Sequence, residues 1–354
     1  GNSTKNISWR YIPNSNYIAT TRLSKTEYNF IVDFGIDFNP NSSSSDTSTT
    51  PLSSGSTDLD LLLDNIVEDI DFNQNIKFII SNNMSFDAGW QIKQLNLEYR
   101  EVFGGQEYTN LHSTPKIYST FFNITFNPNP IFYINTGLRA SKYNQYNNLL
   151  LNPTFGIKYN PISDLAIKVS VGRYSQFLYT INQEEELLRI VDFWQPIPEG
   201  EKPQEADHLI LGTEYWISNG NTISLEAYYK SYSSIYDLNP APDYSNIEET
   251  FALSGTAKAY GVEFLYRFNK NKFNGWLSYA YSNIRRTVDL NSDFILDNNK
   301  EIYPAKYDKP HSFNSLVSYQ INEKYSLGLS SIFGSGQTYT PVIGKVHQAG
   351  VQAY

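Results

Sequence analysis

Apolar and polar residues alternate with a period of two along most of the chain. Leu165, Ile167, Val169 and Val171 alternate with small or polar residues, and a similar pattern runs through 222–233. Successive side chains of a β-strand point to opposite faces, so this pattern predicts strands with one apolar face. Because it recurs along most of the chain, it predicts an all-β protein.

About fourteen strands are predicted in this way, each close to the roughly ten residues that a tilted membrane-spanning strand needs. The predicted spans are 16–23, 28–38, 76–85, 88–102, 117–126, 131–143, 152–159, 165–174, 208–217, 222–233, 258–268, 273–283, 311–320 and 325–333.

The stretch 58–71 has a different pattern. Its Leu, Ile and Val residues, among them Leu59, Leu63 and Ile70, recur at helical spacing with acidic residues opposite. This spacing predicts a short amphipathic helix folded over the base of a loop. A site for a divalent ion or a partner is the alternative interpretation.

Short and long connections alternate between the predicted strands. The short ones are rich in turn residues, as in hairpins: 24–27, 127–130, 160–164, 218–221, 269–272 and 321–324. The long ones are 39–75, 103–116, 174–207, 234–257 and 284–310, with 144–151 as a modest member. Short turns at one end and long loops at the other are typical of a transmembrane antiparallel up-and-down β-barrel, so we expect the short turns on the periplasmic side and the long loops on the extracellular side. A large soluble antiparallel protein, the alternative, gives no reason for this segregation of loop length.

The composition agrees with such a barrel and excludes other classes. Aromatic residues make up 15% of the 354 residues, and Tyr and Trp favour boundaries between apolar and wet surroundings. The net charge of −9 argues against nucleic-acid binding. There is no cysteine, which excludes disulfides and thiolate chemistry, and no apolar run long enough for a transmembrane helix. A mean hydropathy of −0.43 remains compatible with a membrane barrel, because half of each spanning strand can be polar.

Eight short pieces between Phe132 and Pro341, one of them made of two segments, carry a further signal. They are Asn135-Thr-Gly-Leu-Arg139, Leu151-Asn-Pro-Thr-Phe-Gly-Ile-Lys-Tyr159 with Val169-Ser-Val-Gly-Arg-Tyr-Ser-Gln176, Ala206-Asp-His-Leu-Ile-Leu-Gly-Thr-Glu-Tyr215, Ile223-Ser-Leu-Glu-Ala-Tyr-Tyr-Lys230, Ala259-Tyr-Gly-Val-Glu-Phe264, Gly275-Trp-Leu-Ser-Tyr-Ala-Tyr-Ser282, Tyr303-Pro-Ala-Lys-Tyr-Asp-Lys-Pro-His311 and Gly334-Ser-Gly-Gln-Thr-Tyr-Thr-Pro341. In this order they resemble the C-terminal barrel of TonB-dependent outer-membrane receptors. Residues 1–131 fit by pattern rather than by motif.

The resemblance implies a barrel of 22 strands, of which this chain would hold about fourteen. Residues 1–354 are then expected to be a partial β-barrel domain, with the N-terminal plug and the final strands absent. The first residues lack the pattern of a signal peptide, so we expect an internal piece of a longer protein.

The same resemblance implies location in the outer membrane of a Gram-negative cell. The function it implies is uptake of a scarce or bulky extracellular ligand. Energy would come from an inner-membrane TonB-type complex acting through the plug. The implied partners are membrane lipid and lipopolysaccharide, with a surface lipoprotein as a further candidate. A passive porin or a surface-binding barrel without a plug is the alternative, and a soluble β-rich enzyme is the third hypothesis.

No catalytic or cofactor-binding constellation is present in the sequence. It has no P-loop, no dinucleotide-binding glycine pattern and no paired-His zinc motif. The four histidines, at 112, 208, 311 and 347, are dispersed. We therefore expect no enzyme activity, no cofactor and no metal site. The run Glu184–Glu186 can bind a cation, or it can simply be exposed to solvent.

Aromatic residues of the long connections are the candidates for ligand recognition, because they can stack on a sugar ring, a planar chelate or a peptide. Packing of these aromatics against one another is the equally weighted alternative. Arg173, as a polar lumen position, and His208, at the start of an inward-going strand, are further candidates; for His208 a structural hydrogen bond at the rim is the default. The aromatic candidates are Phe177, Tyr179, Phe193, Trp194, Tyr236 and Tyr244.

Overall fold

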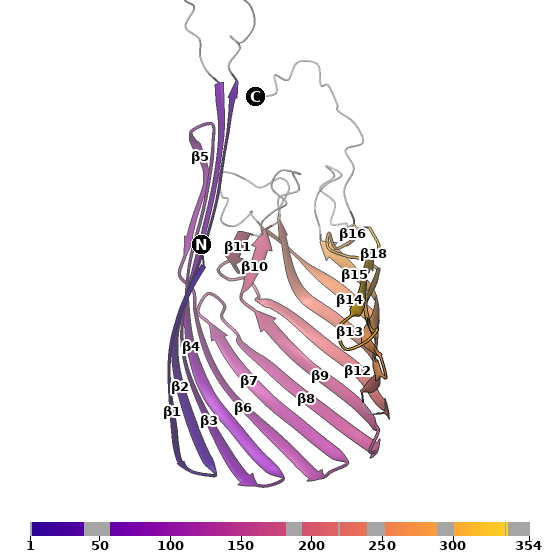
Figure 1. The fold of residues 1–354 in the computed structure, drawn as a ribbon. Helices are drawn as coiled ribbons and strands as arrows, with labels where there is room; N and C mark the ends of the chain where they lie inside the picture. The colour runs from indigo at the N-terminus through magenta and orange to yellow at the C-terminus, as the bar shows by residue number, and fades with distance from the viewer. Residues whose placement is uncertain are drawn as a thin grey trace, which may run out of the picture.

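A computed structural model of the chain describes residues 2–38, 57–181, 193–218, 220–238, 252–288, 301–336 and 338. In this part of the chain sixteen strands form one large antiparallel sheet, and two more form a small separate sheet. The large sheet curves around a central space, as Figure 1 shows. No helix among the described residues is long and apolar enough to cross a membrane.

Fourteen strands follow one another in the large sheet in sequence order, and β5 and β16 pair beside β4 and β15. The strands are β1 (Asn2–Asn14), β2 (Tyr17–Phe38), β3 (Thr57–Ser81), β4 (Met84–Phe103), β5 (Gln106–Ser113), β6 (Lys116–Asn129), β7 (Phe132–Tyr143), β8 (Leu149–Ile162), β9 (Leu165–Gln176), β10 (Leu178–Ile181), β11 (Phe193–Pro196), β12 (Gln204–Ser218), β13 (Asn221–Leu238), β14 (Ala252–Lys270), β15 (Phe273–Val288), β16 (Glu301–Pro304), β17 (His311–Gln320) and β18 (Ser326–Gly334).

The connections confirm the predicted division into two ends. Because consecutive strands pair antiparallel, successive connections lie at opposite ends of the sheet. The short turns at 127–130, 160–164, 269–272 and 321–324 therefore share one end. β5, β10 and β11 lie toward the other end, at the top of Figure 1.

The predicted break at 24–27 is wrong. Residues 16–23 and 28–38, expected as two strands, form the single strand β2, and β1 pairs with its first half. Lys25 is the Cα partner of Lys5 on one side and of Ile70 on the other, so its backbone lies within the sheet. Its side chain also forms an ion pair with Glu68, with Nζ and Oε2 2.6 Å apart. Backbone pairing with a strand on each side therefore outweighs the preference of residues 24–27 for a turn.

The predicted helix at 58–71 is also wrong, because this stretch belongs to β3. Its residues pair with β2 through Phe38↔Thr57 to Tyr17↔Phe78 and with β4 along most of their length. Pairing on both sides satisfies the backbone groups that a helix would have satisfied internally. Three residues, Ile66, Val67 and Ile70, are β-branched and suit a strand.

Several predicted long loops are shorter than expected because the strands continue into them. The stretch 103–116 forms the hairpin strand β5 against β4. Within 174–207 the chain forms β10 and β11, and within 284–310 it forms β16. The loop 39–75 is shortened by β2 and β3, which reach well beyond the other strands in Figure 1.

The small sheet identifies the concave side of the large one. β10 contacts β13, whereas β11 contacts β3 and β4. β4 and β13 are separated by five strands in the sheet order. A short hairpin touches both only if it lies inside the curve, as Figure 1 shows. Side chains that meet the hairpin, such as Asn65, therefore belong to the concave face.

Register extends this assignment across the sheet. Cα partners on antiparallel strands share a face, so the row Gly137, Thr154, Gly172, His208 and Lys230 is concave. The adjacent row is convex, and its members are 38% to 44% exposed. That row consists of Phe155, Val171, Leu209, Tyr229 and Tyr260.

The two faces differ in polarity as the alternation predicted. Val169 shares the convex face with Leu211, its Cα partner. Lys168 lies on the concave face, where its Nζ is 2.7 Å from Oε2 of Glu214. The prediction that 165, 167, 169 and 171 face one side and 168 and 170 the other is confirmed.

Candidate functional site

The β10–β11 hairpin occupies the concave side of the sheet at the long-loop end. Leu178 pairs with Pro196 and Ile181 pairs with Phe193. Asn65 holds this hairpin against β3 with its amide group. Its Oδ1 accepts from the Trp194 N–H at 2.9 Å, and its Nδ2 donates to the Trp194 carbonyl at 3.2 Å. Asn65 is fully buried, so these hydrogen bonds fix both polar atoms of its amide away from water.

A cluster of tyrosines packs beneath the hairpin. The rings of Tyr179 and Tyr236 are 5.4 Å apart, and those of Tyr143 and Phe177 are 5.3 Å apart. The Tyr143 hydroxyl donates to the carbonyl of Ile197 at 2.9 Å. Burial raises the pKa of Tyr179 well above its ordinary value. The cluster joins residues from β7, β10 and β13 into one apolar core at the mouth of the sheet.

Two of the sequence candidates, Tyr179 and Tyr236, lie in this core, and a third, Phe177, is partly buried and packs against it. Tyr179 and Tyr236 are each 4% exposed. Their contacts correspond to the alternative in which loop aromatics pack against one another. Trp194 is partly exposed. Phe193 is the first residue of β11. Tyr244 and Glu184–Glu186 lie outside the described residues.

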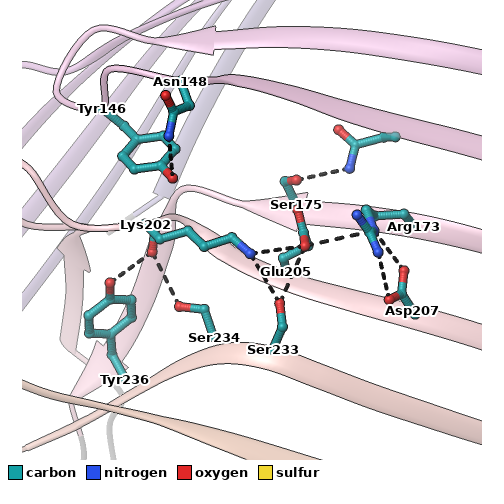
Figure 2. Close-up of polar contacts among 11 residues, drawn as sticks. Tyr146, Asn148, Arg173, Ser175, Lys202, Glu205, Asp207, Ser233, Ser234 and Tyr236 are labelled. Atoms are coloured by element: carbon teal, nitrogen blue, oxygen red, sulfur yellow. Dashed lines mark hydrogen bonds and ion pairs between the residues drawn. The ribbon is translucent and has the colours of Figure 1, made fainter.

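A network of charged groups fastens the return segment after the hairpin (Figure 2). Arg173 donates to both carboxylate oxygens of Asp207, from Nε at 2.8 Å and from Nη2 at 2.9 Å. Lys202 Nζ is 3.1 Å from Oε1 of Glu205, and the Lys202 carbonyl accepts from the Tyr236 hydroxyl at 2.7 Å. This network stabilises the junction of β9, β12 and β13.

Arg173 and His208 lie on opposite faces of the sheet. Arg173 follows Val171 in the alternation of β9, and its Cα partner is Asp207, so it belongs to the convex face. A lumen position for Arg173, as expected from the sequence, does not agree with this register. His208 is concave, with its ring 4.7 Å from the ring of Tyr174 and 6.3 Å from that of Tyr232.

Two residues that the sequence does not single out position the β10–β11 hairpin and the segment after it. Asn65 lies in the stretch predicted as a helix, and Tyr143 lies at the end of a predicted strand. Neither has a local signal, because each contacts residues at least 50 positions away. Among the described residues no group of three His, Asp or Glu side chains gathers where a metal ion could bind.

An antiparallel strand wall with an apolar convex face and a polar concave face defines a β-barrel wall of the transmembrane kind. The model of the TonB-dependent receptor-like β-barrel family matches residues 1–351. The chain therefore belongs to the TonB-dependent receptor family. No curated protein sequence matches it.

Solved structures share the fold at low sequence identity. A complex of FpvAI with pyocin S2 has a TM-score of 0.61 and 10% identity, covering 92% of this chain and 46% of that one. The ferric yersiniabactin uptake receptor FyuA of Yersinia pestis has a TM-score of 0.60 and 13% identity, covering 92% and 48%. The RagAB peptide importer has a TM-score of 0.55 and 12% identity, covering 94% and 48%. The chain spans about half the length of these structural relatives.

Proposed function

We propose that this chain is part of the barrel of an outer-membrane receptor for active uptake. The receptor would bind a scarce or bulky ligand outside the cell and import it with energy from a TonB-type complex. Family membership supports the class. The single observation that supports a membrane location is the convex row from Phe155 to Tyr260, whose apolar side chains are exposed on five neighbouring strands. A contiguous exposed apolar surface needs an apolar solvent or partner.

The domain proposal follows from the edges of the sheet. Every residue of β1 and β18 is exposed, and these strands are the two ends of the sheet order in the described part of the chain. Unpaired strand edges are not tolerated in lipid. We propose that further strands of the whole protein complete the wall, and that a plug through which the transducer acts fills its interior.

Ligand recognition is assigned to the long-loop end. Trp194, whose backbone Asn65 holds at the long-loop end, and its neighbour Phe193 are the aromatic candidates, and Tyr244 remains a candidate from the sequence. His208 adds a concave imidazole near Lys230. Lipopolysaccharide and a surface lipoprotein belong to the same proposal as partners. A passive or surface-binding barrel without a plug is the second candidate, since the wall alone is common to both.

The test measures energy-coupled accumulation by the full-length receptor. Cells with and without the TonB-type complex would receive a panel of labelled ferric chelates and oligopeptides. These classes are bound or imported by proteins of similar fold. Accumulation of one ligand only in cells with the complex is the expected result. Accumulation in both kinds of cell favours the passive barrel.

Binding of that ligand then tests the site. Replacing Phe193 and Trp194 by Ala should weaken binding by about 1–2 kcal/mol, the usual effect of losing an aromatic anchor. The barrel should stay folded, as judged by heat-modifiable mobility in gels, because both residues lie outside the large sheet. Unchanged affinity with an intact barrel moves recognition to the other loops or to the plug.

A further inference from the structure

Three ring side chains lie next to one another on the concave face of β9, β12 and β13. Tyr174 and Tyr232 are both Cα partners of Ala206, and His208 lies on the strand between them. The His208 ring is 4.7 Å from the Tyr174 ring and 6.3 Å from the Tyr232 ring. Gln176, two residues beyond Tyr174, already contacts the base of the β10–β11 hairpin. These three residues, which we call the ring ladder, therefore lie just below the hairpin on the concave wall.

Tyr174 lies along the wall because a glycine makes room for it. A Cβ at Gly172 would be 2.9 Å from the hydroxyl oxygen of Tyr174, so the far end of the ring rests on the glycine backbone. Tyr228, also concave, lies in the same way over Gly261, where a Cβ would be 2.6 Å from its hydroxyl oxygen. Tyr174 is nevertheless 46% exposed. Much of its ring is therefore open toward the space that the sheet encloses.

The polar atoms of the ring ladder have no hydrogen-bond partner within the described part of the chain. Neither the hydroxyl groups of Tyr174 and Tyr232 nor the imidazole nitrogens of His208 form a hydrogen bond there. A hydroxyl group and a neutral imidazole can each donate one hydrogen bond and accept another. The ring ladder therefore offers hydrogen-bonding groups beside apolar ring surfaces.

Two cationic side chains beside the ring ladder already have partners. Lys230, the Cα partner of His208, has its Nζ 5.0 Å from the centre of the Tyr228 ring. Arg286, on the concave face of β15, forms an ion pair with Asp237, with Nη1 and Oδ2 3.2 Å apart. An anionic chelate needs cations that are available to it, whereas a neutral ligand needs apolar surface and hydrogen bonds. The surroundings of the ring ladder favour the neutral ligand.

We propose that the ring ladder binds a neutral oligosaccharide as the ligand of this receptor. A sugar ring has apolar C–H faces that stack on aromatic rings, and hydroxyl groups around its edge that exchange hydrogen bonds. Tyr174 and Tyr232 are two strands apart, which places them about 10 Å from each other at the usual strand spacing. Two sugar units of one chain can then stack on the tyrosines, while His208 hydrogen-bonds to a hydroxyl group between them. The inference rests on the proposed function and names the ligand class of its site.

The first experiment probes a glycan array with the full-length receptor in mild detergent micelles. The array carries neutral oligosaccharides (α- and β-linked glucans, mannans and xylans) together with the disaccharide of each. Ferric chelates and oligopeptides are titrated beside them by calorimetry. Binding of at least one neutral oligosaccharide, more tightly than its disaccharide, is the expected result, because a longer chain reaches both tyrosines. Binding of no neutral glycan, or of a ferric chelate or a peptide only, would overturn the proposal.

Variants then test the ring ladder with the oligosaccharide that binds. Tyr174→Ala and Tyr232→Ala should each lower the affinity about tenfold, the usual effect of losing an aromatic anchor. Tyr174→Phe keeps the ring and should retain most of the affinity. Tyr229→Ala is the matched control, because Tyr229 lies on the convex face of β13 and is exposed to a similar extent, 43%. It should leave the affinity unchanged.

Two further measurements separate the ring ladder from barrel folding and from the proposed function. Heat-modifiable mobility is measured first for every variant, and equal affinities of the wild type, Tyr174→Ala and Tyr232→Ala in intact barrels would contradict the proposal. Uptake is measured in cells with and without the TonB-type complex. Accumulation of a ferric chelate or an oligopeptide only with the complex, without glycan binding, supports active uptake and overturns the ring ladder as a glycan site. Equal accumulation of the bound oligosaccharide in both kinds of cell contradicts active uptake alone.

Discussion

At the scale of single residues, the face of the sheet on which a side chain lies decides how strongly an introduced charge destabilises the barrel. Val169 and Ser170 are neighbours in β9 but lie on opposite faces. Val169→Arg should destabilise the barrel by about 2–4 kcal/mol if it lies near the bilayer midplane, because arginine then faces lipid. Ser170→Arg, the control, places the same side chain on the polar concave face and should cost far less. Urea unfolding of the full-length receptor in lipid vesicles measures both, and equal losses would contradict the assignment of faces.

Asn65 gives a second prediction at this scale. Asn65→Ala removes three hydrogen bonds, two to the backbone of Trp194 and one to the Glu98 carbonyl. A buried group left without its partner costs about 1–3 kcal/mol, and two of the three lost hydrogen bonds hold the hairpin. Limited proteolysis should therefore cut within 178–196 faster than in the wild type, while the large sheet stays folded. The control is Asn135→Ala on β7, whose side-chain hydrogen bond to Thr125 lies far from the hairpin.

At the scale of strands and turns, local composition located most elements correctly. Four predicted spans agree with the observed strands to within a few residues at each end: 131–143, 165–174, 273–283 and 311–320. Two of the failures occurred in segments that pair with another strand on each side. The stretch 58–71 has a helical pattern but is paired on both sides, and 24–27 has turn residues inside a strand. Long-range pairing decided both, and no window of local sequence contains it.

The two ends of the strands give a prediction of topology. The chain has no cysteine, so single cysteines introduced by mutation report their own position. Asn271→Cys, in a short turn, should be protected from an impermeant thiol reagent in intact cells. Gly200→Cys, after the β10–β11 hairpin, should react. Both are exposed and have a positive φ, which makes them a matched pair. Labelling of Asn271→Cys from outside would reverse the proposed orientation.

At the scale of the whole molecule, the curved sheet separates the tryptophans. Trp90 lies on the convex face, as the Cα partner of Thr120 and Gln74, and is 43% exposed. Trp216 lies on the concave face, where Lys158 Nζ is 5.9 Å from its ring centre. The two faces should therefore differ in their access to lipid.

Quenching by brominated lipid tests this separation. In a full-length receptor that keeps one of these tryptophans, with the others replaced by Phe, Trp90 should be strongly quenched. Trp216 should be quenched little, because the barrel wall shields it from acyl chains. Equal quenching of the two would mean that the sheet does not separate lipid from lumen.

The sequence alone determined the strand class, the alternation of faces and the division into short and long connections. These are local properties, because side-chain direction has a period of two and turn chemistry extends over a few residues. The tertiary structure alone decided the course of β2 and β3 and the inward position of the β10–β11 hairpin. It also placed Tyr179 and Tyr236 in the buried core, with Phe177 packed against it. Each of these depends on partners distant in the chain, which no short stretch of sequence contains.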